Sequence, residues 1–537
     1  MNFANLLLAE WTKLRTIRRW MITLGFVALL TAGLSALAAS GARTDVNEKR
    51  NFVTGPDGKP VADSLQFAHQ PITGDATITV HVNSVTPLAN PGGGSDAGMT
   101  PVPDTPWTGS AAGVMIKDGT EPGSSYVAVL LNPTQGVRMQ ADFAQDIAGS
   151  TGNTSRWLRL TRTGTAVTGY ESADGRTWQK IGTMTPSHLA ANAQAGFYVC
   201  SSDRQAWSRG MGSSSLAMRP GQAQATFDHP TLEPSTEPDA WQNSRIKMPH
   251  ELAMEQATTK LDNRDGNSNG ANGNGQNGGQ GNDPNRRQST TGDETRPGVP
   301  DGLTVSGGTY TLAGRGKVGP EPPMDDIVSM SLIGVIAGLL TLIPIGVLFA
   351  TSEFRKAMIR TTFTTEPRRG RVLAAKVIVL GAVSYVLSLL SVAAAFLLAQ
   401  PQLRKHGFAP PAFTPPALAD PGVIRVFLLT ALFMTAVAVF ALGLGMYLRH
   451  SAAAITTTVV LFVAPLIAGL LLPGDSPKFL MYTTLAGGLA TQRLSPATNL
   501  LAEPWAMIGP WTAIAVTLVY AAVGVGLAWW RIRTRDV

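Results

Sequence analysis

The sequence predicts a mixed fold, a six-helix transmembrane domain with an extracellular β-sandwich inserted between the first and second spans. First, six uncharged apolar stretches are each long enough to cross a bilayer, which takes about 20 residues. Second, only 15% of the residues are charged, whereas soluble domains have about 25%. Third, the polar residues concentrate in one block, residues 40–326, in which short apolar runs alternate with turn-forming residues.

Residues 1–19 are predicted to form an amphipathic helix in the cytoplasmic membrane interface. Its apolar residues recur at helical spacing on one face: Phe3, Leu7, Trp11 and Leu14. Glu10 falls on another face. We expect an indole at headgroup depth and two cations near lipid phosphates to anchor this helix: Trp11, Lys13 and Arg15. The alternative is that the helix only continues the first span into water.

The six apolar stretches are the predicted spans: 20–39, 327–350, 377–399, 426–447, 452–472 and 511–530. The first of them also has features of a signal peptide, because basic residues precede it and Ala36-Leu37-Ala38 fits a cleavage site. Its N-terminal flank is long for a signal peptide and contains Glu10 and Trp11, which favours a retained span.

The lysines and arginines near the span ends predict the orientation. They concentrate in the N-terminal flank, in the connection 351–376, at Arg449 and in the C-terminal tail. Because such residues accumulate in cytoplasmic loops, we expect both termini in the cytoplasm and residues 40–326 outside the cell. The net charge of +7 therefore indicates membrane topology and contact with the lipid bilayer, not nucleic-acid binding.

The connection between the second and third spans is predicted to contain a helix at 352–364. Ser352 would cap its N-terminus, where Glu353 complements the helix dipole. Pro367 would end it, and three further membrane anchors follow: Arg368, Arg369 and Arg371. This helix is either a positively charged membrane anchor or a docking element for a cytoplasmic partner.

A shorter apolar segment lies between the fifth and sixth spans. Residues 479–491 are too few to cross a bilayer and contain Gly487 and Gly488. We predict a re-entrant segment over 479–503, with a surface loop as the alternative.

Both ends of the chain and its spans resemble the permease subunit of type-2 ABC exporters in the form common in actinobacteria. The resemblance is carried by AEWTKLRT (9–16), SEFRKAMIRTT (352–362), PRRGRVLAAK (367–376) and GPWTAIAV (509–516). It implies that 352–364 is the coupling helix that contacts a separate cytoplasmic ATPase, and that two permease subunits form one exporter. The residues assigned to this contact are Glu353, Phe354, Arg355, Arg360, Thr361 and Thr362. The large polar block departs from that family.

The chain itself is not expected to be an enzyme or to carry a cofactor. Its closest approaches to a nucleotide-binding loop, GPDGKP (55–60) and GRGKV (314–318), lack the P-loop spacing. The three glutamates of 61–235 have no acid two positions away, which argues against a glycosidase: Glu121, Glu171 and Glu233. No metal site is predicted, because the aspartates of this block lack ligand spacing.

Residues 61–235 are predicted to form the sandwich from nine strands: 77–82, 113–116, 126–131, 136–143, 157–162, 167–172, 178–182, 195–200 and 224–232. Asp174-Gly175 predicts a two-residue hairpin turn. The Asn- and Gly-rich segment 262–300 predicts a flexible linker, and 301–320 could return a strand to the sandwich. Cys200 lies in an apolar run, which predicts a buried thiol.

The sandwich resembles concanavalin-like modules of the regulation-of-enolase type, through AAGVMIKD (111–118), WLRLTRTG (157–164) and YESADGRTW (170–178). The resemblance implies a fold in which some members bind glycans. Candidate stacking residues, which could equally belong to the core, are Trp107, Tyr198 and Trp207. A membrane-anchored protein that binds or senses extracellular glycans is therefore the alternative to an exporter subunit.

Overall fold

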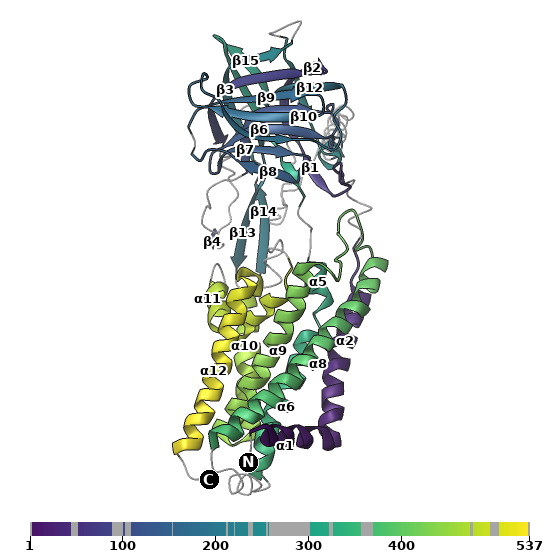
Figure 1. Ribbon diagram of the computed structural model, residues 1–537, viewed down its shortest axis with the longest axis vertical. Coiled ribbons are helices and arrows are strands. Elements are labelled where there is room, and N and C mark those ends of the chain that lie inside the picture. The colour runs from purple at the N-terminus through teal and green to yellow at the C-terminus, as the bar shows by residue number, and fades with distance from the viewer. Residues whose placement is uncertain are drawn as a thin grey trace, which may run out of the picture.

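The chain folds into a helical bundle and a two-sheet β-sandwich, which lie at opposite ends of an elongated molecule (Figure 1). A computed structural model describes residues 3–44, 52–88, 100–101, 109–152, 154–210, 213–219, 221–234, 240–253, 256, 301–321, 326–355, 369–472, 476–494 and 504–534. For residues 19, 100–101, 204–210, 213–219, 353–355, 504 and 506 the description is limited to the backbone. The predicted linker 262–300 lies outside the described residues.

Among the described residues, six helices are long and apolar enough to span a membrane. They are α2 (Arg18–Gly41), α6 (Val335–Arg355), α8 (Arg369–Lys405), α9 (Pro421–Leu448), α10 (Ser451–Leu471) and α12 (Pro510–Thr534). The shorter helices are α1 (Phe3–Thr16), α5 (Ile327–Ser331), α11 (Ser476–Thr483), η1 (Leu485–Gln492) and η2 (Pro504–Met507). Helix α9 is central and packs against α6, α8, α10, α12 and η1, as expected for a helix that is apolar on all sides.

The second predicted span is interrupted, because α5 ends at Ser331 and α6 begins at Val335. At the break, Gly334 lies against α2. A Cβ atom there would sit 2.1 Å from the Thr31 carbonyl oxygen, and the Gly334 amide donates to Ser35 Oγ at 3.0 Å. The contact between the two backbones therefore accounts for a glycine at the point where the helix breaks.

The sandwich consists of two seven-stranded antiparallel sheets. The first has the order β11-β10-β9-β3-β15-β18-β17, and the second has the order β16-β2-β12-β5-β6-β7-β8. The strands of the first sheet are β3 (Ala76–Leu88), β9 (Arg156–Thr163), β10 (Ala166–Ser172), β11 (Gln179–Met184), β15 (Gln222–Glu233), β17 (Gly302–Ser306) and β18 (Thr309–Gly314). Those of the second are β2 (Leu65–Thr73), β5 (Ser110–Lys117), β6 (Tyr126–Asn132), β7 (Gly136–Ala141), β8 (Gln145–Ala148), β12 (Asn192–Ser201) and β16 (Gln242–Ile246).

Alternate side chains of the two sheets meet in one apolar core that includes Val80, Val129, Leu160 and Phe197. A short ribbon of β1 (Val61–Asp63) and β19 (Val318–Pro320) covers part of the outer face of the second sheet. A hairpin of β13 (Arg204–Gly210) and β14 (Ser213–Arg219), with β4 (Thr100–Pro101) beside it, extends from the sandwich toward the helices (Figure 1).

Each of the nine predicted strands coincides with a strand of the structure, but the sandwich does not end at residue 235. Strand β16 pairs with β2, and β18 pairs with β15 from Thr309 to Gly314. Leu312 of β18 is fully buried in the shared core. Residues 301–320 therefore complete the sandwich, and the boundary at 235 was wrong because these pairings connect segments far apart in the chain.

The hairpin around Asp174 has a longer loop than the two-residue turn predicted. Strand β10 ends at Ser172 and β11 begins at Gln179. The Asp174 carboxylate organises this loop by accepting from the amides of Arg176 and Thr177 at 2.9 and 2.8 Å, and these bonds hold its pKa well below the usual range. The Asp174 side chain, which caps backbone amides of the loop, thus takes the place of the two-residue turn that was predicted.

Cys200 is buried on β12, which confirms the prediction of a buried thiol. Its side chain packs with Ala111 and Tyr198 beneath the β1–β19 ribbon. Burial raises the pKa of the Cys200 thiol to about 12. A thiol that stays protonated is a poor nucleophile, so Cys200 acts as a small apolar side chain.

Candidate functional site at the end of the bundle far from the sandwich

The predicted cytoplasmic residues lie at the end of the bundle opposite the sandwich. Helix α1, the last turns of α6 and α12, and the first turns of α8 meet there, and both termini of the chain are at this end (Figure 1). Helix α1 lies across the ends of the long helices, as an interfacial helix would.

The buried face of α1 overlaps the predicted apolar face only in part. Leu6, Glu10 and Leu14 are buried, whereas Trp11 is 44% exposed. Leu6 packs on Val372 of α8. Of the predicted apolar face, Leu14 is buried and Phe3 and Leu7 pack on α8, but the buried side also takes in Glu10, which has its charge partner on α8. Trp11 and Arg15 remain on the exposed side, where membrane anchors are expected.

Glu10 joins α1 to α8 through an ion pair with Lys376. Lys376 Nζ donates to Glu10 Oε2 at 2.9 Å, and both side chains are 1% exposed. Lys13 Nζ donates to the other oxygen, Oε1, at 2.8 Å, but it is 34% exposed. Lys376 Nζ also lies 5.1 Å from the centre of the Phe349 ring of α6. One carboxylate therefore connects α1 to α8, next to α6.

A hydrogen bond joins the start of α8 to the end of α12. Arg369 Nη1 donates to the Ile532 carbonyl at 3.1 Å. Within α12, the guanidinium of Arg533 lies 4.2 Å from the centre of the Trp529 ring, a cation–π distance. Arg369 and Arg371 are thus part of the first turns of α8, and Arg368 lies outside the described residues.

The predicted coupling helix does not begin as expected. Helix α6 runs without a break through Ser352 to Arg355, so Ser352 caps no new helix. Glu353, Phe354 and Arg355 continue the span by one turn, because nothing in their sequence interrupts helical hydrogen bonding. The other residues assigned to the ATPase contact lie outside the described residues: Arg360, Thr361 and Thr362.

The η1 part of the segment between α10 and α12 is buried, which contradicts a surface loop there. Every residue of η1 is buried, and η1 packs against α9, α10 and α12. A Cβ atom on Gly488 would meet the Phe433 ring at 2.0 Å, so only glycine fits this contact. Arg425 Nη2 fixes the end of η1 by donating to the Arg493 and Leu494 carbonyls at 2.9 and 3.2 Å. Residues 495–503 lie outside the described residues.

The candidate glycan-stacking residues do not form an exposed platform. Tyr198 is 1% exposed beneath the β1–β19 ribbon, so its ring has no free face for a sugar. Burial also raises its pKa well above the usual value. Trp107 and the side chain of Trp207 lie outside the described residues. For Tyr198 the burial supports the alternative that it belongs to the core, which the strand period could not decide because it does not reveal what covers the outer face of a sheet.

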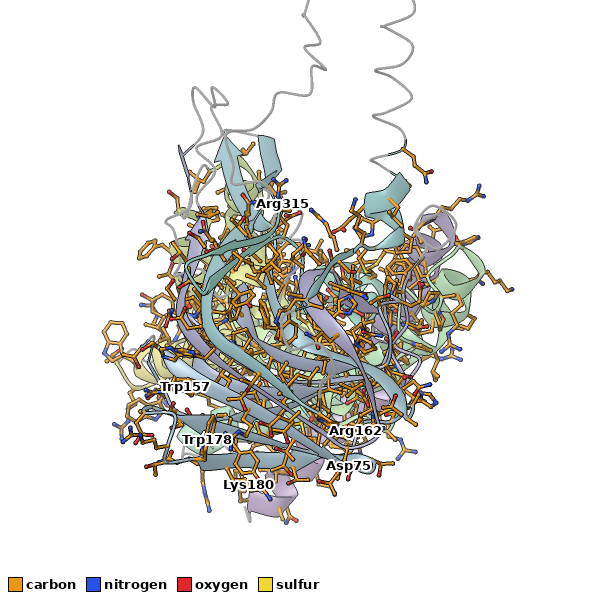
Figure 2. The ribbon with its side chains drawn as sticks, turned by 90° about the horizontal axis from the view of Figure 1, so that it is seen from above. Asp75, Trp157, Arg162, Trp178, Lys180 and Arg315 are labelled. Carbon is orange, nitrogen blue, oxygen red and sulfur yellow. The ribbon has the colours of Figure 1, made fainter. Side chains whose placement is uncertain are left out.

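Sequence reasoning missed a polar and aromatic group on the outer face of the first sheet. The Arg159 guanidinium stacks on the Trp178 ring at 3.8 Å, and the rings of His81 and Trp157 stack at 4.8 Å. Figure 2 places Trp157, Trp178 and Lys180 on the same side of the sandwich. Trp157 and Arg159 alternate with buried Leu158 along β9, a strand signal that could have identified this face.

Comparison with known proteins gives no family. No family model matches the chain, and no curated protein matches it. Matching solved structures include a functionally unknown protein from Saccharomyces cerevisiae, at 13% identity and a TM-score of 0.20 over 32% of this chain and 74% of that one. Another is scytalido-glutamic peptidase with a transition state analog inhibitor, at 10% identity and a TM-score of 0.25 over 48% of this chain and 99% of that one. Similarity this low carries no functional argument.

Proposed function

We propose that the chain is the membrane-spanning permease subunit of an ABC exporter, driven by ATP hydrolysis on a separate cytoplasmic subunit. The observation that carries the proposal is the convergence of α1, α6, α8 and α12 at the end of the bundle that bears the basic flanks. The connection 356–368 leaves α6 and enters α8 at this same end. A partner that moved this connection would act directly on two spans.

The contacts at this end are suited to transmit such a movement. Helix α8 begins at Arg369 and continues to Lys405, so one rigid element links the connection to the side of the bundle that faces the sandwich. Through Glu10 and Lys376, α1 is held to α8. A push on the start of α8 would therefore tilt α8 and α1 together, a rigid-body change of the kind that alternating access requires.

Two such subunits would enclose the transport path, in a plasma membrane with the sandwich outside the cell. The large apolar surface of α2, α8 and α12 supports placement in lipid, with exposed side chains that include Leu29, Leu390 and Val519. The exposed indoles of Trp11, Trp529 and Trp530 near the cytoplasmic end suit the level of the headgroups.

The proposal is tested by co-purification of the full chain with an ATPase and by measurement of ATP turnover in the complex. Glu353→Lys and Arg360→Glu should leave the protein in the membrane but uncouple it from the ATPase, because a broken charge pair at an interface costs about 2–5 kcal/mol. Arg404→Glu is the matched control, because Arg404 is an exposed arginine at the opposite end of α8.

If both test variants assembled with the ATPase and turned over ATP normally, residues 352–364 would serve only as a membrane anchor. If no ATPase co-purified with the wild-type chain, the exporter proposal would be rejected in favour of a membrane-anchored glycan-binding or sensing protein.

A further inference from the structure

The sandwich contains an ion pair that is removed from water completely. Lys117 Nζ at the end of β5 lies 2.6 Å from Asp63 Oδ2 at the end of β1, and both side chains are 0% exposed. Burying two opposite charges is expensive even when they are paired, and an apolar pair of similar size is often no less stable. Charge pairing alone therefore does not explain why these two residues are buried together.

The surroundings orient both groups and exclude water. The rings of Tyr126 and Phe143 lie 5.9 and 5.8 Å from Lys117 Nζ, which also donates to the Ser124 carbonyl at 3.0 Å. The amide of Gly123 donates to Asp63 Oδ2 at 2.7 Å. Among the described atoms, the other carboxylate oxygen, Oδ1, is buried and accepts no hydrogen bond.

This arrangement provides the parts of an amide-forming reaction. A contact of 2.6 Å to Oδ2 holds the nitrogen against the carboxyl group whose carbon it would attack, which supplies the fixed placement that speeds reactions between bound groups. The amide of Gly123 donates to Oδ2, the oxygen that would leave, and stabilises the negative charge that develops on it as its bond to carbon breaks. The hydrogen bond from Lys117 Nζ to Asp63 Oδ2 is the path along which the reaction would move a proton from nitrogen to oxygen.

We propose that Lys117 and Asp63 condense into an intramolecular amide bond. The ammonium of Lys117 first transfers a proton to Asp63, and the amine lone pair then attacks the carboxyl carbon. A bond forms between Lys117 Nζ and Asp63 Cγ, the bond from Cγ to Oδ2 breaks, Oδ2 leaves as water with the transferred proton and one more from the nitrogen, and Oδ1 becomes the amide carbonyl oxygen. No oxidant, reductant or further reactant is required.

The position of the bond suggests what it does for the molecule. Asp63 pairs with Val318 in the β1–β19 ribbon, through which the chain enters the sandwich from α2 and leaves it toward α5 and α6. Lys117 belongs to the second sheet. The amide would thus fasten the ribbon that carries both connections covalently to the sandwich, in a chain whose single cysteine cannot form an internal disulfide.

The test is mass spectrometry of the purified full-length protein after denaturation. We expect a mass lower than that of the sequence by one water molecule. Trypsin should fail to cut after Lys117, because an acylated lysine is no substrate, and a branched peptide should join the segments around Asp63 and Lys117. Lys117→Arg should restore the mass of its own sequence and two linear peptides.

A second lysine–aspartate pair in the same chain is the matched control. Lys59 Nζ lies 3.1 Å from Asp57 Oδ2, but these side chains are 67% and 36% exposed. Water should keep this pair ionised and unlinked, and Lys59→Met should leave the loss of water intact. Recovery of an unmodified Lys117 peptide from the wild-type protein, without the branched peptide, would overturn the proposal, and this measurement does not require any variant to fold.

Discussion

The ion pair between Glu10 and Lys376 predicts how firmly α1 is held to the bundle. Glu10→Gln would leave the Lys376 ammonium buried at 1% exposure without its carboxylate. Removal of one partner from a buried pair costs about 3–5 kcal/mol, because the remaining charge stays desolvated. Since 1.4 kcal/mol corresponds to about a factor of ten, α1 should detach from α8 roughly two to four orders of magnitude more often.

Thiol labelling of a cysteine beneath α1 measures this detachment. Leu6 is 4% exposed and packs on Val372 and Ala375, so Leu6→Cys should react only when α1 opens. In a Cys200→Ala background and in detergent, the labelling rate of Leu6→Cys should rise roughly hundredfold or more when Glu10→Gln is added, by the cost of a broken buried pair.

Lys13→Gln is the matched control, because Lys13 binds the same carboxylate at 2.8 Å but is 34% exposed. Exposed pairs contribute about 0–1 kcal/mol, so the labelling rate should change by less than about tenfold. Adding Lys376→Met to Glu10→Gln should bring the labelling rate most of the way back to that of the parent, since no buried charge remains unpaired. The reasoning is refuted if Glu10→Gln labels no faster than Lys13→Gln, or if the two substitutions at the buried pair are additive.

Three further predictions follow from the fold. A polypeptide of residues 52–320 should unfold cooperatively in denaturant, whereas one of residues 61–235 should not. The shorter polypeptide lacks β16 to β19, so β15 loses its pairing with β18. Equal cooperativity of the two polypeptides would contradict the sheet order. Because burial raises the pKa of Cys200 to about 12, its thiol should resist alkylation at pH 9 until the protein is denatured, and rapid labelling of the native protein would show that the site is open. A cysteine in place of exposed Ser476, on the sandwich side of the bundle, should react with a membrane-impermeant thiol reagent on intact cells. A cysteine in place of exposed Thr534, near the C terminus, should react only after the cells are permeabilised. The reverse pattern would invert the topology.

Local sequence patterns were sufficient for the elements themselves. A run of uncharged apolar residues such as 426–447 identifies a span, because every residue of a helix in lipid faces an apolar environment. The period of two along β9 places Leu158 and Leu160 inside the sandwich and leaves Trp157 and Arg159 outside. Both signals arise from neighbouring residues, so they are present in the sequence before any tertiary contact forms.

Tertiary structure decided which faces are covered and which charges meet. Glu10 is buried because Lys376 lies beside it, although 366 positions separate the two residues in the chain. Tyr198 is buried because the β1–β19 ribbon crosses the outer face of its sheet, and β15 finds a partner in β18 more than 70 positions further along the chain. Periodicity reports only that one side of an element is apolar. The distant segment that packs on that element then determines whether a charged residue becomes a buried contact or an aromatic ring becomes a binding surface.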